Sequence, residues 1–198
     1  GGYKVNAMVR NPSKVAEESQ HHPNLTLIKG SFDDTDAIAK TVQGSDYVVC
    51  MASAAAVKPY PTDIMKNFVE TLIPVLTNDK KIKCFLYQAG AFSKDANDNI
   101  DTVPFILRET LGRMMGNYPM VRDNDAVIKL ICGDGGADMK KVPYIITRPG
   151  GLKEDTATGT VGISDKAAST MITYEDLAKV TLEALNNEKL YGTLPFIA

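Results

Sequence analysis

The 198-residue sequence contains no tryptophan, two histidines and three cysteines. The odd number and wide spacing of Cys50, Cys84 and Cys132 fit neither a disulfide framework nor the ligand spacing of a metal site. Because Cys50 and Cys84 lie in apolar stretches of strand character, we interpret them as core residues of a protein from a reducing intracellular compartment. A histidine-based metal site would have to use both His21 and His22, and a solvated turn explains that pair more simply, so we expect no metal.

Strong charge and long apolar runs are also missing. A net charge of −2 gives no electrostatic basis for binding nucleic acid or an anionic membrane surface. No apolar run is long enough to cross a bilayer, and the first residues lack the apolar core of a secretory signal. We therefore expect no direct membrane insertion, and a cytoplasmic and an organellar location both stay open. The composition, 44% hydrophobic and 23% charged, is ordinary for a globular domain of this length.

The sequence does contain an alternation of strand and helix signals without repeats. Short apolar runs predict strands at residues 4–9, 25–28, 46–51, 82–87, 144–147 and 194–197, and polar stretches predict loops at 93–102 and 133–137. The fully apolar run at 46–51 is typical of a parallel-sheet strand that is buried on both faces. Helical spacing predicts helices at 13–19, 37–42, 63–76, 105–115, 120–131 and 173–185, with Pro74 expected to kink or end the third of them. The acidic cluster at 33–36 is expected to cap the second helix, and Thr173 with Asp176 is expected to form a capping box at the last. This order is typical of an α/β fold: a doubly wound, Rossmann-like parallel sheet with helices on both faces, formed by residues 1–198 as one domain.

The first predicted strand ends in a cationic turn with the sequence Arg10-Asn11-Pro12-Ser13-Lys14. Ligands of open α/β sheets bind at the carboxyl ends of the strands. A guanidinium donates in a planar fork that matches a phosphate, so we hypothesise that Arg10, Asn11 and Lys14 hold the adenosine 2′-phosphate of NADP(H). From these residues alone, the alternative is a surface turn with ordinary solvated charges.

Several stretches, taken in order, resemble the atypical short-chain dehydrogenases/reductases, in particular the NmrA-like and biliverdin/flavin reductase-like NAD(P)-binding group. They are KVNAMVRNPSK, IKGSFDDTDAIAKTVQGSDYVVCMAS, YQAGAF, ITRPGGL followed by TATGTV, and ITYEDLAKVTLEALNN. The resemblance covers nearly the whole chain and implies NADP(H) as the cofactor. It also implies contacts at the carboxyl edge: Phe32 and Asp33 at the adenine, Ala52 and Ser53 along the ribose and pyrophosphate, and Ala89, Gly90, Pro149 and Gly150 at the nicotinamide end.

The sequence departs from this group at its beginning. Members start with a strand and a glycine-rich turn whose backbone N–H groups hold the pyrophosphate. No such turn stands at the start here, and the residues around Gly1 resemble the end of the helix that follows it. A strand, turn and helix of about 20–25 residues are therefore expected to be absent. The strand would be central in the sheet, so a further segment or a protein partner is expected to fill the gap. The Gly133-Asp134-Gly135-Gly136 stretch follows a predicted helix and is interpreted as a surface loop.

The catalytic residues of the superfamily are not evident. Typical members pair a tyrosine with a lysine four residues later, which lowers the pKa of the phenol. No tyrosine here has a lysine at that distance; Tyr118 is followed by Arg122, and Tyr144 by Arg148. Tyr118 is a catalytic candidate beside its simpler interpretation as an amphipathic residue at a helix entry.

The flavin/biliverdin reductase group uses a serine and a histidine near the cofactor, and the resemblance places glycines, Gly90 and Gly150, at those positions. Where many atypical members have a lysine or histidine on the helix after the active-site loop, the resemblance places Asn124 in this chain, and Asn124 is a second catalytic candidate. Asparagine donates and accepts hydrogen bonds but does not shuttle protons. The sequence thus has residues suited to binding the cofactor, whereas the residues expected to transfer a proton are replaced.

The sequence leaves two functions open. The first is an NADPH-dependent reductase that transfers a hydride to a planar conjugated acceptor such as a flavin or quinone. The second is a non-catalytic NADP-binding protein that acts as a redox sensor, an assembly factor or an accessory subunit of a larger complex.

Overall fold

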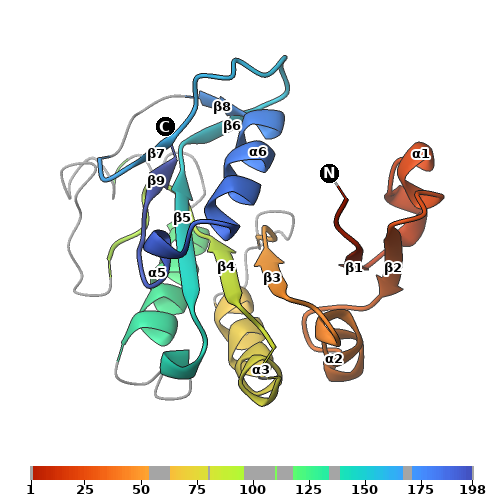
Figure 1. The fold of residues 1–198 in the computed structure, drawn as a ribbon. Helices are drawn as coiled ribbons and strands as arrows, with labels where there is room; N and C mark the ends of the chain where they lie inside the picture. The colour runs from red at the N-terminus through yellow and green to blue at the C-terminus, as the bar shows by residue number, and fades with distance from the viewer. Residues whose placement is uncertain are drawn as a thin grey trace.

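The computed structural model describes residues 2–53, 63–79, 81–95, 110, 118–133, 139–166 and 171–197 (Figure 1). The strands are β1 Val5–Val9, β2 Leu25–Lys29, β3 Tyr47–Cys50, β4 Cys84–Gln88, β5 Tyr144–Pro149, β6 Gly151–Lys153, β7 Ile163–Ser164, β8 Met171–Thr173 and β9 Phe196–Ile197. The α-helices are α1 Glu17–Gln20, α2 Thr35–Val42, α3 Ile64–Asn78, α5 Tyr118–Cys132 and α6 Tyr174–Leu185, and the 3-10 helices are η1 Pro12–Lys14, η4 Met139–Lys141 and η5 Glu188–Leu190. All but residue 110 of the predicted helix at 105–115, and most of both predicted loops, lie outside the described residues.

The strands form three sheets within the described part of the chain. β1 and β2 pair in parallel, and a five-stranded sheet has the order β3-β4-β5-β9-β7. In that sheet, β3, β4, β5 and β9 are parallel, while β7 is antiparallel to β9. β6 and β8 form a small parallel pair. This arrangement confirms the predicted Rossmann-like α/β fold class, although β6, β7 and β8 were not predicted.

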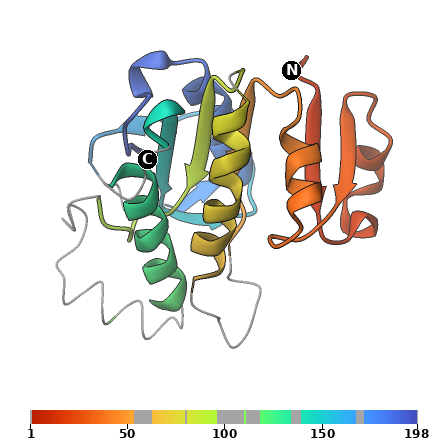
Figure 2. The same cartoon turned by 90° about the horizontal axis from the view of Figure 1, so that it is seen from below.

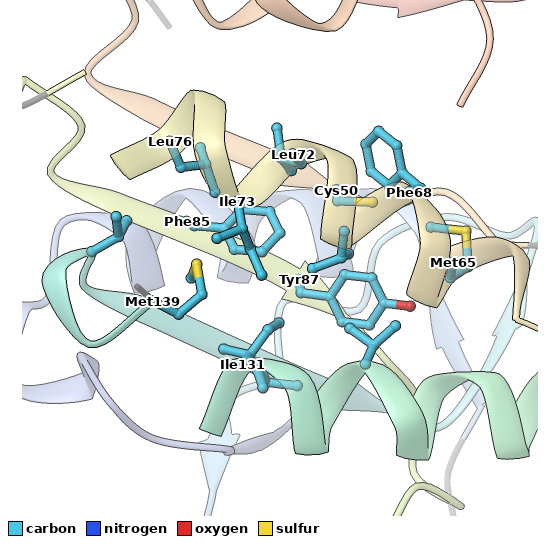
Figure 3. Packing of buried hydrophobic residues seen from close by; sticks show 14 of the residues in the cluster. Cys50, Met65, Phe68, Leu72, Ile73, Leu76, Phe85, Tyr87, Ile131 and Met139 are labelled. Atoms are coloured by element: carbon cyan, nitrogen blue, oxygen red, sulfur yellow. The ribbon is translucent and has the colours of Figure 1, made fainter. Parts of the chain in front are cut away.

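Helices cover both faces of the five-stranded sheet, as the two cartoon views show (Figures 1 and 2). On one face, α3 and α5 pack on β4 through a cluster that includes Phe68, Leu72, Phe85, Tyr87 and Ile131 (Figure 3). Alternate strand residues face the other way, where Cys84, Leu86 and Ile145 pack against Ala184 and Leu185 of α6. The period of two along each strand therefore gives both helical layers an apolar surface to cover.

The β1–β2 sheet is attached to the rest of the molecule through α2 and the turn after β2. Asp34 caps α2 by accepting a hydrogen bond from the N–H of Ala37 at 2.9 Å. The rings of Phe32 and Phe68 lie with their centroids 4.9 Å apart, which joins the end of β2 to α3. Met8 also packs against the main core cluster. These contacts fix the carboxyl end of β1 relative to the other strands.

Three sequence predictions need correction. The helix predicted at 13–19 is divided into η1 and α1, because Val15 is extended, with a ψ of 139°. The helix predicted at 63–76 continues through Pro74 to Asn78. The strand at 46–51, predicted to be buried on both faces, is buried on one: Val49 and Met51 are 40% and 43% exposed, whereas Cys50 lies in the core.

Candidate functional site

The residues proposed for the cofactor lie where the parallel strands end. Arg10 to Lys14 follow β1, Phe32 and Asp33 follow the end of β2 by a few residues, and Ala52 and Ser53 follow β3. Ala89 and Gly90 follow β4, whereas Pro149 ends β5 and Gly150 comes next. Because the carboxyl ends of parallel strands meet at one edge of a sheet, the fold gathers these positions at the edge where α/β proteins bind ligands.

The cationic turn after β1 borders an open hollow of about 550 Å³. Its lining consists of Val9, Arg10, Asn11, Lys14 and Val15. Arg10 and Lys14 are exposed, and neither forms an ion pair or a side-chain hydrogen bond with another described residue. Two cations without a carboxylate partner can bind a phosphate through charge-assisted hydrogen bonds.

Asn11 shapes this turn. Its side-chain oxygen accepts hydrogen bonds from the Ser13 N–H at 3.1 Å and from the Ser13 hydroxyl at 2.8 Å. These bonds cap η1, with Pro12 at its first position, where the missing N–H of a proline costs nothing. The oxygen of Asn11 is thus used to hold Arg10 and Lys14 on the same short turn.

The turn after β2 lies beside the first. The Gly30 N–H donates to the Val9 carbonyl at 3.1 Å, which joins the ends of β1 and β2. Phe32 is partly buried against the core, so its ring has a structural role whether or not it also contacts an adenine. The hydroxyl of Ser31 donates to Asp33, and this hydrogen bond is the main cause that lowers the pKa of the Asp33 carboxyl. The turn after β2 therefore carries a carboxylate that its own Ser31 hydroxyl stabilises in the ionised form.

The backbone just after β4 continues to form hydrogen bonds with β5. The Ala89 N–H donates to the Thr147 carbonyl at 2.9 Å, and the Ala91 N–H donates to the Pro149 carbonyl at 2.8 Å. Between them, Gly90 has a φ of +137°, which side chains rarely allow. The structure thus brings Ala89 and Gly90 beside Pro149, as the nicotinamide-end prediction requires. Ala52 packs against the main core cluster at the end of β3, the strand paired with β4.

Three consecutive polar residues of α5 organise this edge, and the sequence interpretation used only one of them. Asp123 is 2% exposed and accepts hydrogen bonds from the backbone N–H groups of Met65 and Lys66 at 2.8 and 3.0 Å. It caps the beginning of α3, where the residue at the cap position, Asp63, has a φ of 71° and makes no side-chain cap. Asp125 accepts from the Lys94 N–H at 2.8 Å and holds the segment after β4.

Asn124 has both polar atoms engaged inside the protein. Its side-chain oxygen accepts from the Tyr87 hydroxyl at 2.7 Å, and its side-chain NH₂ donates to the Ala89 carbonyl at 2.9 Å. The residue is 4% exposed. Burial raises the pKa of Tyr87 well above its usual value, so the phenol is a neutral donor. Asn124 positions the end of β4, a role distinct from the catalytic one considered for it.

The other tyrosine candidates give no acid–base pair in the described part of the chain. Tyr118 begins α5, and its side chain lies outside the described residues. Tyr144 and Arg148 lie on β5, not on a helix. The Nε and Nη2 atoms of Arg148 donate to the Leu194 carbonyl at 3.0 and 2.7 Å, and its guanidinium carbon lies 3.6 Å from the centre of the Phe196 ring. Arg148 therefore ties β5 to β9.

The TATGTV stretch, which resembles a loop over the nicotinamide, is fixed to the start of α6 by Asp176. This carboxylate accepts from the N–H groups of Thr158 and Gly159 at 2.8 and 2.9 Å, and from the hydroxyls of Thr158 and Thr173 at 3.0 and 2.9 Å. The hydrogen bond from the Thr158 N–H is the largest cause that lowers the pKa of Asp176 to about 2. Thr173 caps α6 in return by accepting from the Asp176 N–H, which agrees with the predicted capping box.

None of the helices in the described part of the chain combines the length and the apolar character that a bilayer crossing demands. The same residues include no group of three or more His, Cys, Asp or Glu side chains placed to hold a metal ion.

The fold is similar to solved NAD(P)-binding structures. A wide-type short-chain dehydrogenase/reductase from Veillonella parvula in complex with NADP superposes with a TM-score of 0.69 at 16% identity, over 98% of this chain and 82% of that chain. ChuY, an anaerobilin reductase from Escherichia coli O157:H7, gives 0.68 at 16% identity, over 98% and 83%. The oxidoreductase ylbE from Lactococcus lactis gives 0.70 at 17% identity, over 100% and 80%. At these identities the likeness shows the fold alone.

A search of curated proteins returned no match. The family model described as NAD(P)H-binding matches residues 1–188, which is nearly the whole sequence. This match confirms the family expected from the sequence stretches, and with it an NAD(P)H cofactor. The chain therefore belongs to the NAD(P)H-binding family of Rossmann-like proteins.

Proposed function

We propose that the protein is an NADPH-dependent reductase that transfers a hydride to a planar conjugated acceptor of the flavin or quinone kind. The observation that carries this proposal is the hollow after β1, where Arg10 and Lys14 lie on one turn of a chain from an NAD(P)H-binding family. NADPH differs from NADH by one phosphate on the adenosine ribose, and these two cations are the groups that would recognise it.

Different residues along the sheet edge would bind the two ends of the cofactor. Arg10 offers a planar fork of donors and Lys14 a mobile ammonium, while Asn11 holds the turn in shape. At the other end, Ala89, Gly90 and Gly150 have small or absent side chains, so flat rings can approach the backbone closely. When bound, NADPH supplies the hydride, and the reduced acceptor takes its proton from water.

The names of two neighbours agree with a reductase that uses NADP. ChuY is named an anaerobilin reductase, and the Veillonella protein was solved with NADP. A conjugated ring system accepts a hydride and a proton in separate steps, so it does not demand the tyrosine–lysine pair that a simple carbonyl uses. This suits a sequence in which no tyrosine is followed by a lysine four residues later.

A second candidate is a non-catalytic NADP-binding protein that serves as a sensor, an assembly factor or an accessory subunit. The position of Asn124 favours it, because both polar atoms of that side chain are committed to Tyr87 and Ala89. The glycines at positions 90 and 150 favour it as well, since the resemblance places a serine and a histidine there.

The test has two parts. Calorimetry with NADPH and NADH compares the protein with Arg10→Glu and with Lys189→Glu, an exposed control in η5. We expect a preference for NADPH of about 10–100-fold, from one or two charge-assisted hydrogen bonds, that Arg10→Glu abolishes and the control retains. An unchanged preference in Arg10→Glu would refute the assignment of the phosphate site.

The second part separates the two functions. NADPH oxidation is followed at its absorbance maximum, without oxygen, in the presence of a panel of flavins and quinones. Turnover above the rate without protein supports the reductase. Tight NADPH binding with no turnover on any acceptor supports the non-catalytic candidate instead.

A further inference from the structure

Two neighbouring residues of the large sheet each have a buried polar atom that makes no hydrogen bond. Gln88, the last residue of β4, lies opposite Thr147 of β5 in the register of the two strands. The side-chain oxygen of Gln88 and the hydroxyl of Thr147 are both buried, and neither has a hydrogen-bond partner among the residues that the structure describes. A buried amide oxygen or hydroxyl is costly unless it is hydrogen-bonded, so two of them side by side indicate a bound polar group.

Both side chains face helix α6. Because side chains alternate along a strand, Leu86 and Gln88 share one face of β4, and Ile145 and Thr147 share the same face of β5. Leu86 and Ile145 pack in a cluster with the carboxyl end of α6. Gln88 and Thr147 therefore lie under the same helix, one step nearer to the carboxyl edge of the sheet.

Helix α6 contributes a third polar atom of this kind. Thr181 is 4% exposed, and within the described part of the chain its hydroxyl is also without a hydrogen-bond partner. Leu177 and Leu185, four residues before and after it, lie on the same side of the helix. Leu185 packs in the cluster of Ile145, and Leu177 packs in the cluster of Ile197. Thr181 thus lies between two apolar clusters on the buried face of α6.

Thr147 has the corresponding position on the sheet. It lies between Ile145, which belongs to the first cluster, and Pro149, whose register partner in β9 is Ile197 of the second. Two residues of strand advance about 6–7 Å, and four residues of helix advance about 6 Å. Measured from the first cluster, Thr147 and Thr181 are therefore at the same level between the sheet and the helix.

We propose that Gln88, Thr147 and Thr181 together bind one water molecule inside the protein. The two hydroxyls would donate to the water oxygen, and the water would donate to the side-chain oxygen of Gln88, which can only accept. These are about three hydrogen bonds, the usual number for a buried water. The nearly complete burial of both threonines leaves no access for a large ligand, so water is the class of ligand that fits.

The water would connect α6 to the backbone beside the nicotinamide end. Gln88 directly precedes Ala89, whose backbone N–H donates to the Thr147 carbonyl. On the other side of the sheet, the side chain of Asn124 donates to the Ala89 carbonyl. The segment after β4 would thus be held from both helical layers, by a side chain of α5 and by a water under α6.

The direction of a stability change separates a hydrated site from three unsatisfied groups. Valine has the shape of threonine without the hydroxyl, so Thr147→Val and Thr181→Val each remove one hydrogen bond to the water. We expect each variant to melt about 2–4 °C lower. Thr26→Val, at an exposed position of β2, is the control and should shift the melting temperature by less than about 1 °C. An unchanged or raised melting temperature in either buried variant overturns the proposal, because removal of an unsatisfied hydroxyl stabilises a protein.

A count of long-lived internal water molecules tests for the ligand itself. Magnetic relaxation dispersion of the oxygen-17 nucleus of water measures this count in solution. It should fall by one in Thr147→Val and in Thr181→Val, and it should stay the same in Thr26→Val and in Thr181→Ser, which keeps the hydroxyl. If the melting temperature falls while the count stays constant in the two valine variants, the side chains bond to one another directly and the proposal is wrong.

The double variant tests whether the two hydroxyls share one water. Thr147→Val and Thr181→Val together should remove a single water and lower the melting temperature by less than the sum of the two separate shifts. The loss of two waters with additive shifts would show two separate sites and would overturn the proposal. All three measurements use the protein without NADPH, so their outcome is independent of the test of the reductase.

Discussion

The side-chain NH₂ of Asn124 donates a hydrogen bond of 2.9 Å to the carbonyl oxygen of Ala89, which connects α5 to the residue just beyond β4. The other end of the same amide accepts from Tyr87, a fully buried phenol in the core. One side chain thus links the interior of the protein to the segment predicted to line the nicotinamide. A change at this position acts on the site through the placement of Ala89.

We expect Asn124→Ala to lower the free energy of unfolding by about 2–4 kcal/mol, because it leaves the Tyr87 hydroxyl and the Ala89 carbonyl buried without partners. Urea denaturation measures the loss. Asn78→Ala, an exposed change at the end of α3, is the matched control and should cost less than about 0.5 kcal/mol. Similar values for the two variants would contradict the positioning role of Asn124.

Asp123 makes a second testable connection, from α5 to the beginning of α3. We expect Asp123→Ala to cost about 2–4 kcal/mol, since two N–H groups of α3 lose a charged acceptor. Asp63→Asn is the control, because Asp63 precedes the helix but makes no side-chain cap, and asparagine also tolerates the left-handed backbone at that position. Urea denaturation of both variants should therefore show a large effect only at position 123. An equal loss at both positions would contradict the capping of α3 from α5.

The features predicted well from the sequence are those whose signal is local. The cap by Asp34, the capping box of Thr173 and Asp176, and the turn from Arg10 to Lys14 each arise from a few adjacent residues. Their physical causes, a side chain that bonds its own backbone or a proline at a helix start, are present in any window of the sequence.

The features that the sequence did not reveal depend on residues far apart in the chain. Asp123 caps a helix that begins almost sixty positions earlier, and no local rule connects the two. The exposure of Val49 is of the same kind, because an apolar strand residue is buried only if another element covers it. A run of polar residues within an apolar helix, as at positions 123–125, is the one signal that could have indicated buried hydrogen bonds.

Asp176 predicts a pH dependence. Its pKa falls from 3.8 to about 2 in the folded protein, so the ionised carboxylate favours the folded state above pH 3.8. This contribution is lost as the pH falls from 3.8 through 2. We expect Asp176→Asn to lower the melting temperature by several degrees at pH 7, with a difference from the unsubstituted protein that shrinks between pH 4 and pH 2.

Asp155→Asn is the control for this prediction, because Asp155 lies in the same segment and its pKa is also lowered, by Lys153, but its side chain is exposed. Solvent screens such a pair, so its removal should change the melting temperature little at any pH. If the two variants melt alike from pH 7 to pH 2, Asp176 does not hold the segment around Thr158.

Gly90 allows the backbone of the site to be tested apart from any side chain. A methyl group added at Gly90 would meet no atom within 4 Å, so Gly90→Ala can act only through the φ of +137°. We expect a loss of about 1–3 kcal/mol in unfolding free energy, or a shift of the Ala89 and Ala91 amides away from β5 that raises the KM for NADPH. Gly162→Ala is the matched control, since it also has open space but an unstrained φ. If Gly90→Ala were as harmless as Gly162→Ala in both denaturation and kinetics, the left-handed turn could not be what holds this end of β4 against β5.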